Sequence, residues 1–292
     1  YTLSLHDALP ISKIANLSLD IETFSTESLA KSGVYRYSEA EDFEILLIGY
    51  SVDNAEVKVV DIASGEILPI EIKKAILDPT VIKWAFNAQF ERLCINKHFG
   101  INTTNWECTM VKALSLGFPG SLDSVGKVVG LEPDQQKLMT GKNLIRLFSV
   151  PRKPSKANGF KTVFTKEDKP EEWEQFKEYC LRDVETERII RNKLNRFKQI
   201  AEEQELYALD QKINDRGVLI DLAMAENAIR IDLEQTERLT EIFRKATGLE
   251  NPNSLTDIKK YIKERTGKTV KSITKGNLKE LQEAFKDYED IT

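Results

Sequence analysis

Residues 16–24 have the sequence Asn-Leu-Ser-Leu-Asp-Ile-Glu-Thr-Phe, and the rest of the chain is organised around them. Apolar side chains occupy every second position from Leu17 to Ile21, which predicts a strand packed on a hydrophobic core. Side chains at i and i+2 of a strand leave the same face. We therefore expect Asp20 and Glu22 to point together beside the core.

This acidic pair is a candidate metal site. Two carboxylates held close in a partly apolar place repel each other, so that one of them tends to keep its proton. A divalent cation between them removes the repulsion, and oxygen ligands suit Mg²⁺ or Mn²⁺. The alternative is an acidic pair without function at a frayed strand end. Such a pair is common by chance in a chain in which 30% of the residues are charged. The pair indicates a metal site only if other acids join it.

The composition allows one large or two ordinary domains, since 41% of the 292 residues are hydrophobic. No stretch approaches the ~18–20 apolar residues of a membrane span. We therefore expect no membrane partner and a cytoplasmic location. The 3 cysteines have no Cys-x-x-Cys spacing and are expected to be reduced core thiols. The 2 histidines argue against a His-rich metal site and against a Ser-His-Asp triad.

Residues 1–11 resemble the translation of a sequencing adapter, and the chain does not begin with Met. We expect this stretch to be adapter-derived. It is left out of the predicted fold, as an expression scar would be.

The order of the predicted elements indicates an α/β fold followed by an all-α segment. After the first strand we expect a polar loop at 23–42, strands at 45–52, 56–62 and 81–86, and helices at 69–77, 88–98, 122–129 and 172–206. Beyond a boundary near residue 205, helices are expected at 222–247, 255–266 and 275–288. Gly100 and Gly217 are predicted to end helices.

A cationic segment at residues 135–166 contains no acid, although the net charge of the chain is −5. Its basic residues are Lys137, Lys142, Arg146, Arg152, Lys153, Lys156, Lys161 and Lys166. A local positive surface of this kind is typical of a path for a phosphate backbone, and we expect nucleic acid to contact Arg152, Lys153 and Lys156. The alternative is a solvated face without function. The phenylalanines at 148, 160 and 164 are candidates for stacking on bases, with core packing as the alternative for the first.

Three more residues extend the acidic pair. Glu91 follows the predicted strand 81–86 and lies on the first turn of a helix, where the helix dipole favours an anion. Tyr179 and Asp183 are four positions apart on a predicted helix and share one face. Two-metal phosphoryl hydrolysis uses such acids, because one ion activates a water and the other stabilises the leaving oxygen. A tyrosine can orient the water, although an ordinary pKa near ~10 makes it a poor base.

Three motifs resemble those of the DEDD exonucleases in their tyrosine-bearing branch: Asp20-x-Glu22, Asn87-x-x-Phe90-Glu91 and Tyr179-x-x-x-Asp183. The resemblance implies an RNase H-like fold, which is a mixed sheet with flanking helices. It also implies removal of nucleotides in the 3′→5′ direction with two divalent ions, Mg²⁺ or Mn²⁺.

The resemblance also implies a role for each matching residue. The metal ligands would be Asp20, Glu22, Glu91 and Asp183. Tyr179 would position the attacking water. The residues that help to place the terminal nucleotide would be Thr23, Asn87 and Phe90. Most of the family has Asp at the position of Glu91, and the additional methylene moves the carboxylate by roughly a bond length.

Other segments resemble phage-type family A DNA polymerases, namely residues 177–187, 209–221 and 251–254. The palm motifs Asp-Tyr-Ser-x-Ile-Glu and His-Asp-Glu do not occur, so we expect a chain truncated before the palm. The predicted domains are an RNase H-like 3′-5′ exonuclease at 12–204 and the helical first part of a polymerase domain, the beginning of a thumb, at 205–292.

The resemblance implies single-stranded DNA or a primer 3′ end as substrate, and a polymerase domain of the same parent chain as partner. It also implies that the cytoplasm is that of a bacterial cell or a phage-infected host. The protein is expected to be a monomer. Two alternatives stay open. One is a DEDD-type ribonuclease, because a sensor of the 2′-hydroxyl cannot be recognised from sequence. The other is a catalytically silent module that binds single-stranded nucleic acid, which the intact set of acids disfavours.

Overall fold

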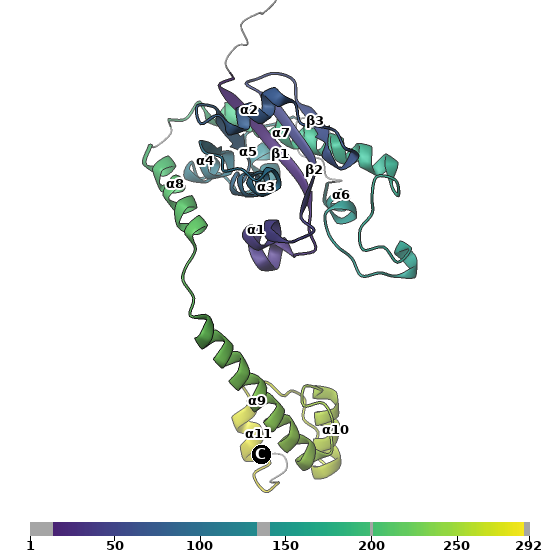
Figure 1. The fold of residues 1–292 in the computed structure, drawn as a ribbon. Coiled ribbons are helices and arrows are strands. Elements are labelled where there is room, and N and C mark those ends of the chain that lie inside the picture. Colours follow the sequence, from purple (N-terminus) through teal and green to yellow (C-terminus); the bar gives the residue numbers. More distant parts are fainter. Residues whose placement is uncertain (1–13, 133–140, 199–200, 289–292) are drawn as a thin grey trace, which may run out of the picture. The chain divides into compact units, whose positions relative to one another are not determined.

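The computed structural model describes residues 14–132, 141–198 and 201–288 (Figure 1). Lys137 of the cationic segment lies outside these residues. The chain divides into two compact units, Tyr1–Asp215 and Arg216–Thr292. The boundary predicted near residue 205 falls inside helix α8 (Ala201–Arg216), most of which belongs to the first unit.

The first unit is built on a mixed five-stranded sheet in the order β3-β2-β1-β4-β5. Its strands are β1 (Asn16–Phe24), β2 (Glu44–Val52), β3 (Lys58–Asp61), β4 (Ile82–Ala85) and β5 (Trp106–Cys108). Strand β2 is antiparallel to both β1 and β3, whereas β4 is parallel to both β1 and β5. The predicted α/β class, with an RNase H-like mixed sheet and flanking helices, is confirmed.

Helices cover both faces of this sheet (Figure 1). The helices of the first unit are α1 (Leu29–Glu39), α2 (Ile70–Leu77), α3 (Gln89–Phe99), α4 (Thr109–Ser115), α5 (Leu122–Val128), α6 (Gly141–Phe148), α7 (Pro170–Leu194) and α8. Short 3-10 turns occur at η1 (Ile62–Ser64) and η3 (Lys156–Asn158). The long helix α7 packs on β1, β2 and β3 and also contacts α4, α5 and α6.

The alternation of β1 separates apolar side chains from acids. Leu17, Leu19 and Ile21 are buried in the main core cluster, to which α2 and α3 also contribute. The side chains between them leave the opposite face, which α7 covers. On that side the Cys180 thiol donates to the carbonyl oxygen of Asp20, with 3.8 Å between sulfur and oxygen. The strand therefore delivers its two acids to the helix that carries Tyr179 and Asp183.

Gly49 allows α7 to approach the sheet closely. It pairs with Asp20 across the β1–β2 ladder. A Cβ atom at this position would lie 2.9 Å from Val184 Cγ2 and 3.0 Å from Cys180 Sγ. Real Cβ atoms do not tolerate such distances, so α7 would have to move away.

Two predicted elements were wrong. The stretch 23–42 is not all loop, because α1 forms there, interrupted by Gly33 at φ 74° and ψ 170°. The single helix predicted at 172–206 is two helices, since α7 ends at Leu194. Tertiary contacts fix this end: Lys112 Nζ donates to Asn195 Oδ1 at 2.5 Å, and the Phe118 and Phe197 rings meet at 6.1 Å. Lys112 and Phe118 are both distant in sequence from the end of α7, so the local sequence does not show where this helix ends.

Other predictions hold. Gly100 and Gly217 follow the last residues of α3 and α8 with φ angles of 62° and 68°, in the left-handed region that favours glycine. All three cysteines are buried free thiols, as expected: Cys94, Cys108 and Cys180.

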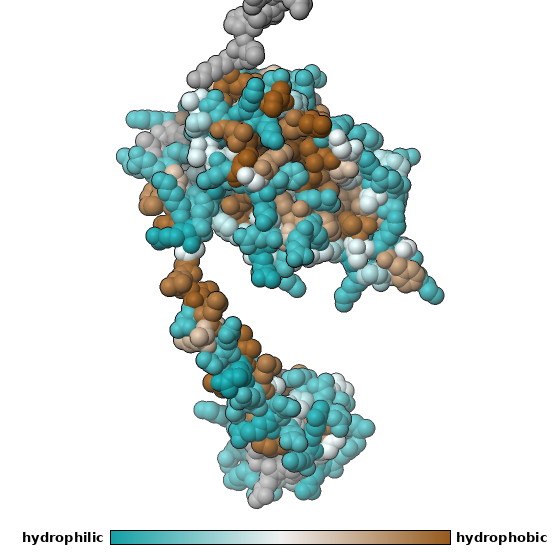
Figure 2. Space-filling view, in the orientation of Figure 1, coloured by the Kyte–Doolittle hydropathy of each residue, from teal (hydrophilic) through white to brown (hydrophobic). Residues whose placement is uncertain are grey.

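The second unit consists of α9 (Leu222–Thr247), α10 (Leu255–Thr266) and α11 (Leu278–Ala284). Its small core is formed by Ile262, Val270 and Phe285. Exposed apolar side chains occur within residues 218–224 and along the length of α9, where Figure 2 shows a run of hydrophobic surface. No helix within the described residues has the length and apolar character needed to cross a membrane.

We predict that Gly49→Ala lowers the free energy of unfolding by about 1–3 kcal/mol, the usual cost of overpacking a core. Gly120→Ala is the matched control, because its Cβ would meet Leu114 Cδ2 at an ordinary 3.5 Å. Chemical denaturation of both variants measures the difference. Equal unfolding free energies for the two would show that α7 does not need the close approach at Gly49.

Candidate active site

A cavity of about 760 Å³ lies by the second half of β1. Its wall includes every residue predicted to bind metal, to position water or to place the terminal nucleotide: Asp20, Glu22, Thr23, Asn87, Phe90, Glu91, Tyr179 and Asp183. The structure therefore brings together residues from β1, the β4–α3 corner and α7. Arg152, Lys153 and Lys156 are not part of this wall.

On β1, the ladder to β2 shifts register between Glu22 and Thr23. Such irregularities re-aim side chains and often occur beside functional sites. Glu22 is buried, whereas Asp20 is partly exposed. Thr23 Oγ1 lies 2.8 Å from Tyr37 Oη of α1, in a buried hydrogen bond. This bond joins the strand to a helix that also lines the cavity.

The corner between β4 and α3 has an unusual backbone. Asn87 has a φ angle of 78°, which is uncommon for residues other than glycine but tolerated best by Asn and Asp. Its carbonyl oxygen accepts from the Phe90 N–H at 2.9 Å. Asn87 does not cap the helix, since Ala88 occupies the N-cap position and makes no side-chain hydrogen bond. The left-handed turn instead starts α3 with Glu91 facing the cavity.

The carboxylate of Glu91 is buried among the other acids of the cavity. It is 4% exposed, and its pKa is raised well above the ordinary value, first by burial and then by the negative charge of Asp20. Glu187 and Asp183 raise it further. Glu91 Oε2 is buried and has no hydrogen-bond partner in the part of the chain that the structure describes. A cation at this oxygen would satisfy it and offset the repulsion.

Tyr179 is held rigidly on α7. Its ring stacks on Phe176 at 6.4 Å between centroids and covers Gly141, where a Cβ atom would lie 2.0 Å from Tyr179 Cε2. Burial raises the pKa of Tyr179 far above its usual value, and the charges of Asp183, Glu22 and Asp20 add to the effect. The phenol therefore stays neutral at physiological pH. It can donate a hydrogen bond to a water but cannot act as a general base.

Glu187 was not among the residues predicted from the sequence to belong to the site. It lies one turn beyond Asp183 on α7, is 2% exposed and accepts a hydrogen bond from Thr109 Oγ1. Burial raises its pKa, while Arg191 opposes the shift. The signal was present, because Tyr179, Asp183 and Glu187 follow one another at intervals of four and so share a helix face.

The predicted loop concealed another part of the cavity wall. Helix α1 and the residues before it contribute Glu27, Ser28, Leu29, Ala30 and Tyr37. The Tyr37 ring packs at 6.0 Å from the Phe90 ring of α3. This wall is largely apolar and faces the acids, as expected for a surface that would contact a sugar or a base.

The acids have the right chemistry for Mg²⁺ or Mn²⁺, because both ions prefer oxygen ligands. Within residues 14–132, 141–198 and 201–288, no three His, Cys, Asp or Glu side chains already form a complete metal-binding cluster. The fit of the site therefore depends on the donor set, which is entirely carboxylate, and on the unsatisfied Glu91 oxygen. The residues that would hold the ions are Asp20, Glu22, Glu91 and Asp183.

Part of the cationic segment lines the cavity, whose wall includes Ile145 and residues 149–151. Arg152 is engaged internally: it donates to the Arg146 carbonyl, and its guanidinium lies 4.5 Å from the Phe164 ring centroid. Lys153 and Lys156, in contrast, are exposed.

The three phenylalanines of the cationic segment differ in exposure. Phe148 is 1% exposed and belongs to the second core cluster, with Trp173 and Phe176, as its core alternative predicts. Phe160 is 65% exposed. Phe164 is partly buried under Arg152. Only Phe160 of the three is therefore free to stack on a base.

Comparisons with known proteins place the chain among nucleases. A family model described as a 3′-5′ exonuclease matches residues 8–199. The DNA polymerase of Bacillus phage SP02 is 48% identical over 273 residues, or 93% of this chain and 42% of the polymerase. The chain thus spans less than half the length of that relative. Trypanosoma brucei RNase D is 16% identical with a TM-score of 0.48, over 68% of this chain and 65% of that one. Brucella melitensis NrnC with bound Mg²⁺ is 12% identical with a TM-score of 0.37, over 68% and 83%.

We predict that Glu91→Gln stabilises the metal-free protein at neutral pH. A raised folded-state pKa means that the unfolded chain loses its proton first, so stability falls as pH rises from about 4.5 through the folded-state pKa. The neutral variant should lose this part of the decline. Urea unfolding in EDTA at several pH values measures it, with the exposed Glu71→Gln as control. Parallel curves for wild type and Glu91→Gln would contradict the prediction.

Proposed function

The chain belongs to the 3′-5′ exonuclease family, and we propose that it removes nucleotides from the 3′ ends of DNA by phosphodiester hydrolysis. The observation that carries the proposal is the shared cavity, in which acids from β1, α3 and α7 meet a neutral tyrosine. The identity with a phage DNA polymerase over 93% of this chain favours DNA as the substrate. It also supports a proofreading role beside a polymerase domain of the same parent chain.

The reaction breaks the bond between phosphorus and the 3′-oxygen of the penultimate nucleotide. A water oxygen attacks the phosphorus, a nucleoside 5′-monophosphate leaves, and the shortened strand receives a proton on its new 3′-hydroxyl. Two Mg²⁺ or Mn²⁺ ions held by the four carboxylates would lower the pKa of the attacking water and stabilise the leaving oxygen. In this proposal none of the four acids acts as a general base, because a carboxylate coordinated to a metal ion is not a free base.

The neutral Tyr179 hydroxyl forms a hydrogen bond with the attacking water and fixes its direction. The Gly141 backbone and the Phe176 ring hold the tyrosine in place. Beside the acids, Phe90 and Thr23 place the terminal nucleotide, and Asn87 lies at the exposed rim of the cavity. The strand upstream then follows the cationic segment, past Lys153 and Lys156.

We predict that Asp20→Ala lowers the rate of 3′-end cleavage at least a hundredfold, because a metal ligand contributes several kcal/mol of charge stabilisation. The assay follows single-stranded DNA labelled at its 5′ end, with Mg²⁺, with Mn²⁺ and with EDTA. Asp123→Ala, which removes an exposed acid paired with Lys127, is the control and should cleave normally. Full activity of Asp20→Ala would remove Asp20 from the mechanism. RNA of the same sequence, cleaved faster than DNA, would instead support the ribonuclease alternative.

We also predict that Lys153→Glu/Lys156→Glu weakens binding of single-stranded DNA and flattens its salt dependence. Each lost phosphate contact lowers the slope of log K against log salt by about 0.7 for single strands. Arg152 is left unchanged because its contacts hold the loop together. Lys58→Glu/Lys74→Glu, with the same charge change on β3 and α2, is the control. Identical slopes for the two double variants would refute a strand path along the cationic segment.

A further inference from the structure

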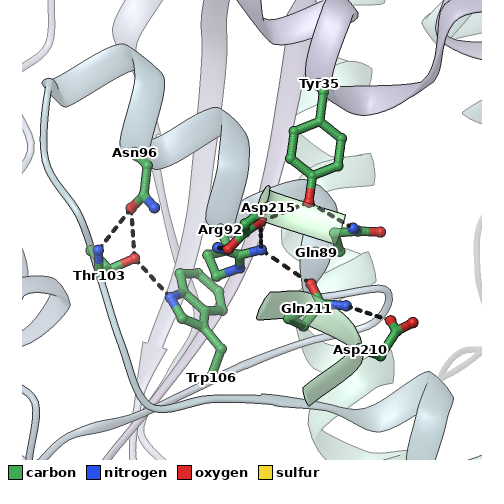
Figure 3. Close-up of polar contacts among 9 residues, drawn as sticks. All are labelled: Tyr35, Gln89, Arg92, Asn96, Thr103, Trp106, Asp210, Gln211 and Asp215. Atoms are coloured by element: carbon green, nitrogen blue, oxygen red, sulfur yellow. Dashed lines mark hydrogen bonds and ion pairs between the residues drawn. The ribbon is translucent and has the colours of Figure 1, made fainter. Parts of the chain in front are cut away.

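Arg92 directs its side chain away from the cavity that its neighbour Glu91 lines. It is 9% exposed and therefore needs a counter-ion. That partner comes from α8: Arg92 Nη1 donates to Asp215 Oδ2 at 2.9 Å, and Nη2 donates to Asp215 Oδ1 at 2.7 Å (Figure 3). Two parallel bonds of this kind fix direction as well as distance.

The same carboxylate also holds α1. Tyr35 Oη donates to Asp215 Oδ1 at 2.6 Å and accepts from Gln89 Nε2 at 3.3 Å (Figure 3). Gln211, one turn before Asp215, accepts from Arg92 Nη2 at 3.2 Å. The hydrogen bonds from Arg92 and Tyr35 hold the pKa of Asp215 below its usual value. Asp215 is therefore ionised at neutral pH and joins α1, α3 and α8 at one point.

The position of α1 matters because Leu29, Ala30 and Tyr37 of this helix form part of the wall of the cavity that the acids also line. Gly33 breaks this helix, and Tyr35 and Tyr37 both follow the break. Tyr37 connects the wall to β1 through Thr23, while Tyr35 connects it to Asp215. The second half of α1 is thus fixed from both sides by a tyrosine hydroxyl, and removing either bond frees one side.

We propose that Asp215 is a positioning residue of the nuclease: it holds the α1 wall and α3, which carries Glu91, in register across the cavity. This inference rests on the proposed function. Helix α8 lies beyond residues 8–199, which the family model matches. The cavity therefore depends on a segment that the sequence resemblance assigned to the polymerase.

The test uses the full chain and three variants. Asp215→Asn weakens both attachments, and Asp215→Glu restores a carboxylate. Tyr35→Phe removes the bond from α1 to Asp215 and the acceptor of Gln89 Nε2, while Arg92 keeps its ion pair with Asp215. Asp210→Asn is the matched control, because Asp210 lies on the same helix and its bond goes only to Gln211 Nε2, at 3.2 Å. Each protein is assayed for KM and kcat on single-stranded DNA, for the Mg²⁺ concentration at half-maximal rate, and for its thermal midpoint.

Asp215→Asn is expected to raise both KM and the half-maximal Mg²⁺ concentration about tenfold, as loss of one charge-assisted hydrogen bond would. Tyr35→Phe should raise KM with a smaller effect on the Mg²⁺ dependence, because Arg92 of α3 keeps its ion pair with Asp215. Asp215→Glu should recover part of the loss, and Asp210→Asn should match wild type.

A purely structural role gives a different result. It would lower the thermal midpoint of Asp215→Asn while KM and Mg²⁺ dependence stay unchanged below that midpoint, and this overturns the inference. If Asp215→Asn does not fold, an unchanged KM for Tyr35→Phe overturns it. A wild-type chain without nuclease activity in Mg²⁺ or Mn²⁺ refutes the proposed function, and the inference with it, so that the two failures are distinguished by the wild-type assay alone.

Discussion

Glu91 is buried in a cavity whose wall also carries Asp20, Glu22 and Asp183, and the repulsion among these carboxylates must be balanced by the packing around them. Without cations, each additional ionised group makes the next ionisation harder. The repulsion would be relieved if the elements that carry the acids moved apart. The packing opposes this movement, because α7 lies so close to the sheet at Gly49 that there is no room for a side chain. The rigidity that costs stability in the absence of cations would keep the proposed ligands in place for the ions of the proposed mechanism.

The sheet explains how acids so distant in sequence come together. Strand β1 is central, so both its faces are covered, and its alternation gives one face to the apolar core and the other to α7. The parallel pairing of β1 with β4 brings the β4–α3 corner, and with it Glu91, beside the carboxyl half of β1. Helix α7 then adds Tyr179, Asp183 and Glu187 from one face. Each acid is delivered by an element with its own packing, so the loss of one need not disturb the others.

Much of this site could be predicted because local periodicity determines it. The i, i+2 spacing of Asp20 and Glu22 and the i, i+4 spacing of Tyr179 and Asp183 follow from strand and helix geometry alone. Features that depend on tertiary contacts could not be predicted in the same way. Helix α1 looked like a loop because Gly33 interrupts it, and α7 ends where Lys112 binds Asn195 from another helix.

The stretch 209–221 shows most clearly what a resemblance leaves undetermined. It resembles a polymerase segment, yet the compact nuclease unit extends to Asp215. A protein that stopped at residue 199, where the family model ends, would leave the buried Arg92 guanidinium without its carboxylate. Removal of one partner from a buried ion pair costs more than replacement of both, because the remaining charge is neither hydrated nor paired. We therefore propose that the counter-ion of Arg92 sets the stable limit of the nuclease, since Arg92 lies beside Glu91, a proposed metal ligand, and its loss of Asp215 would disturb α3.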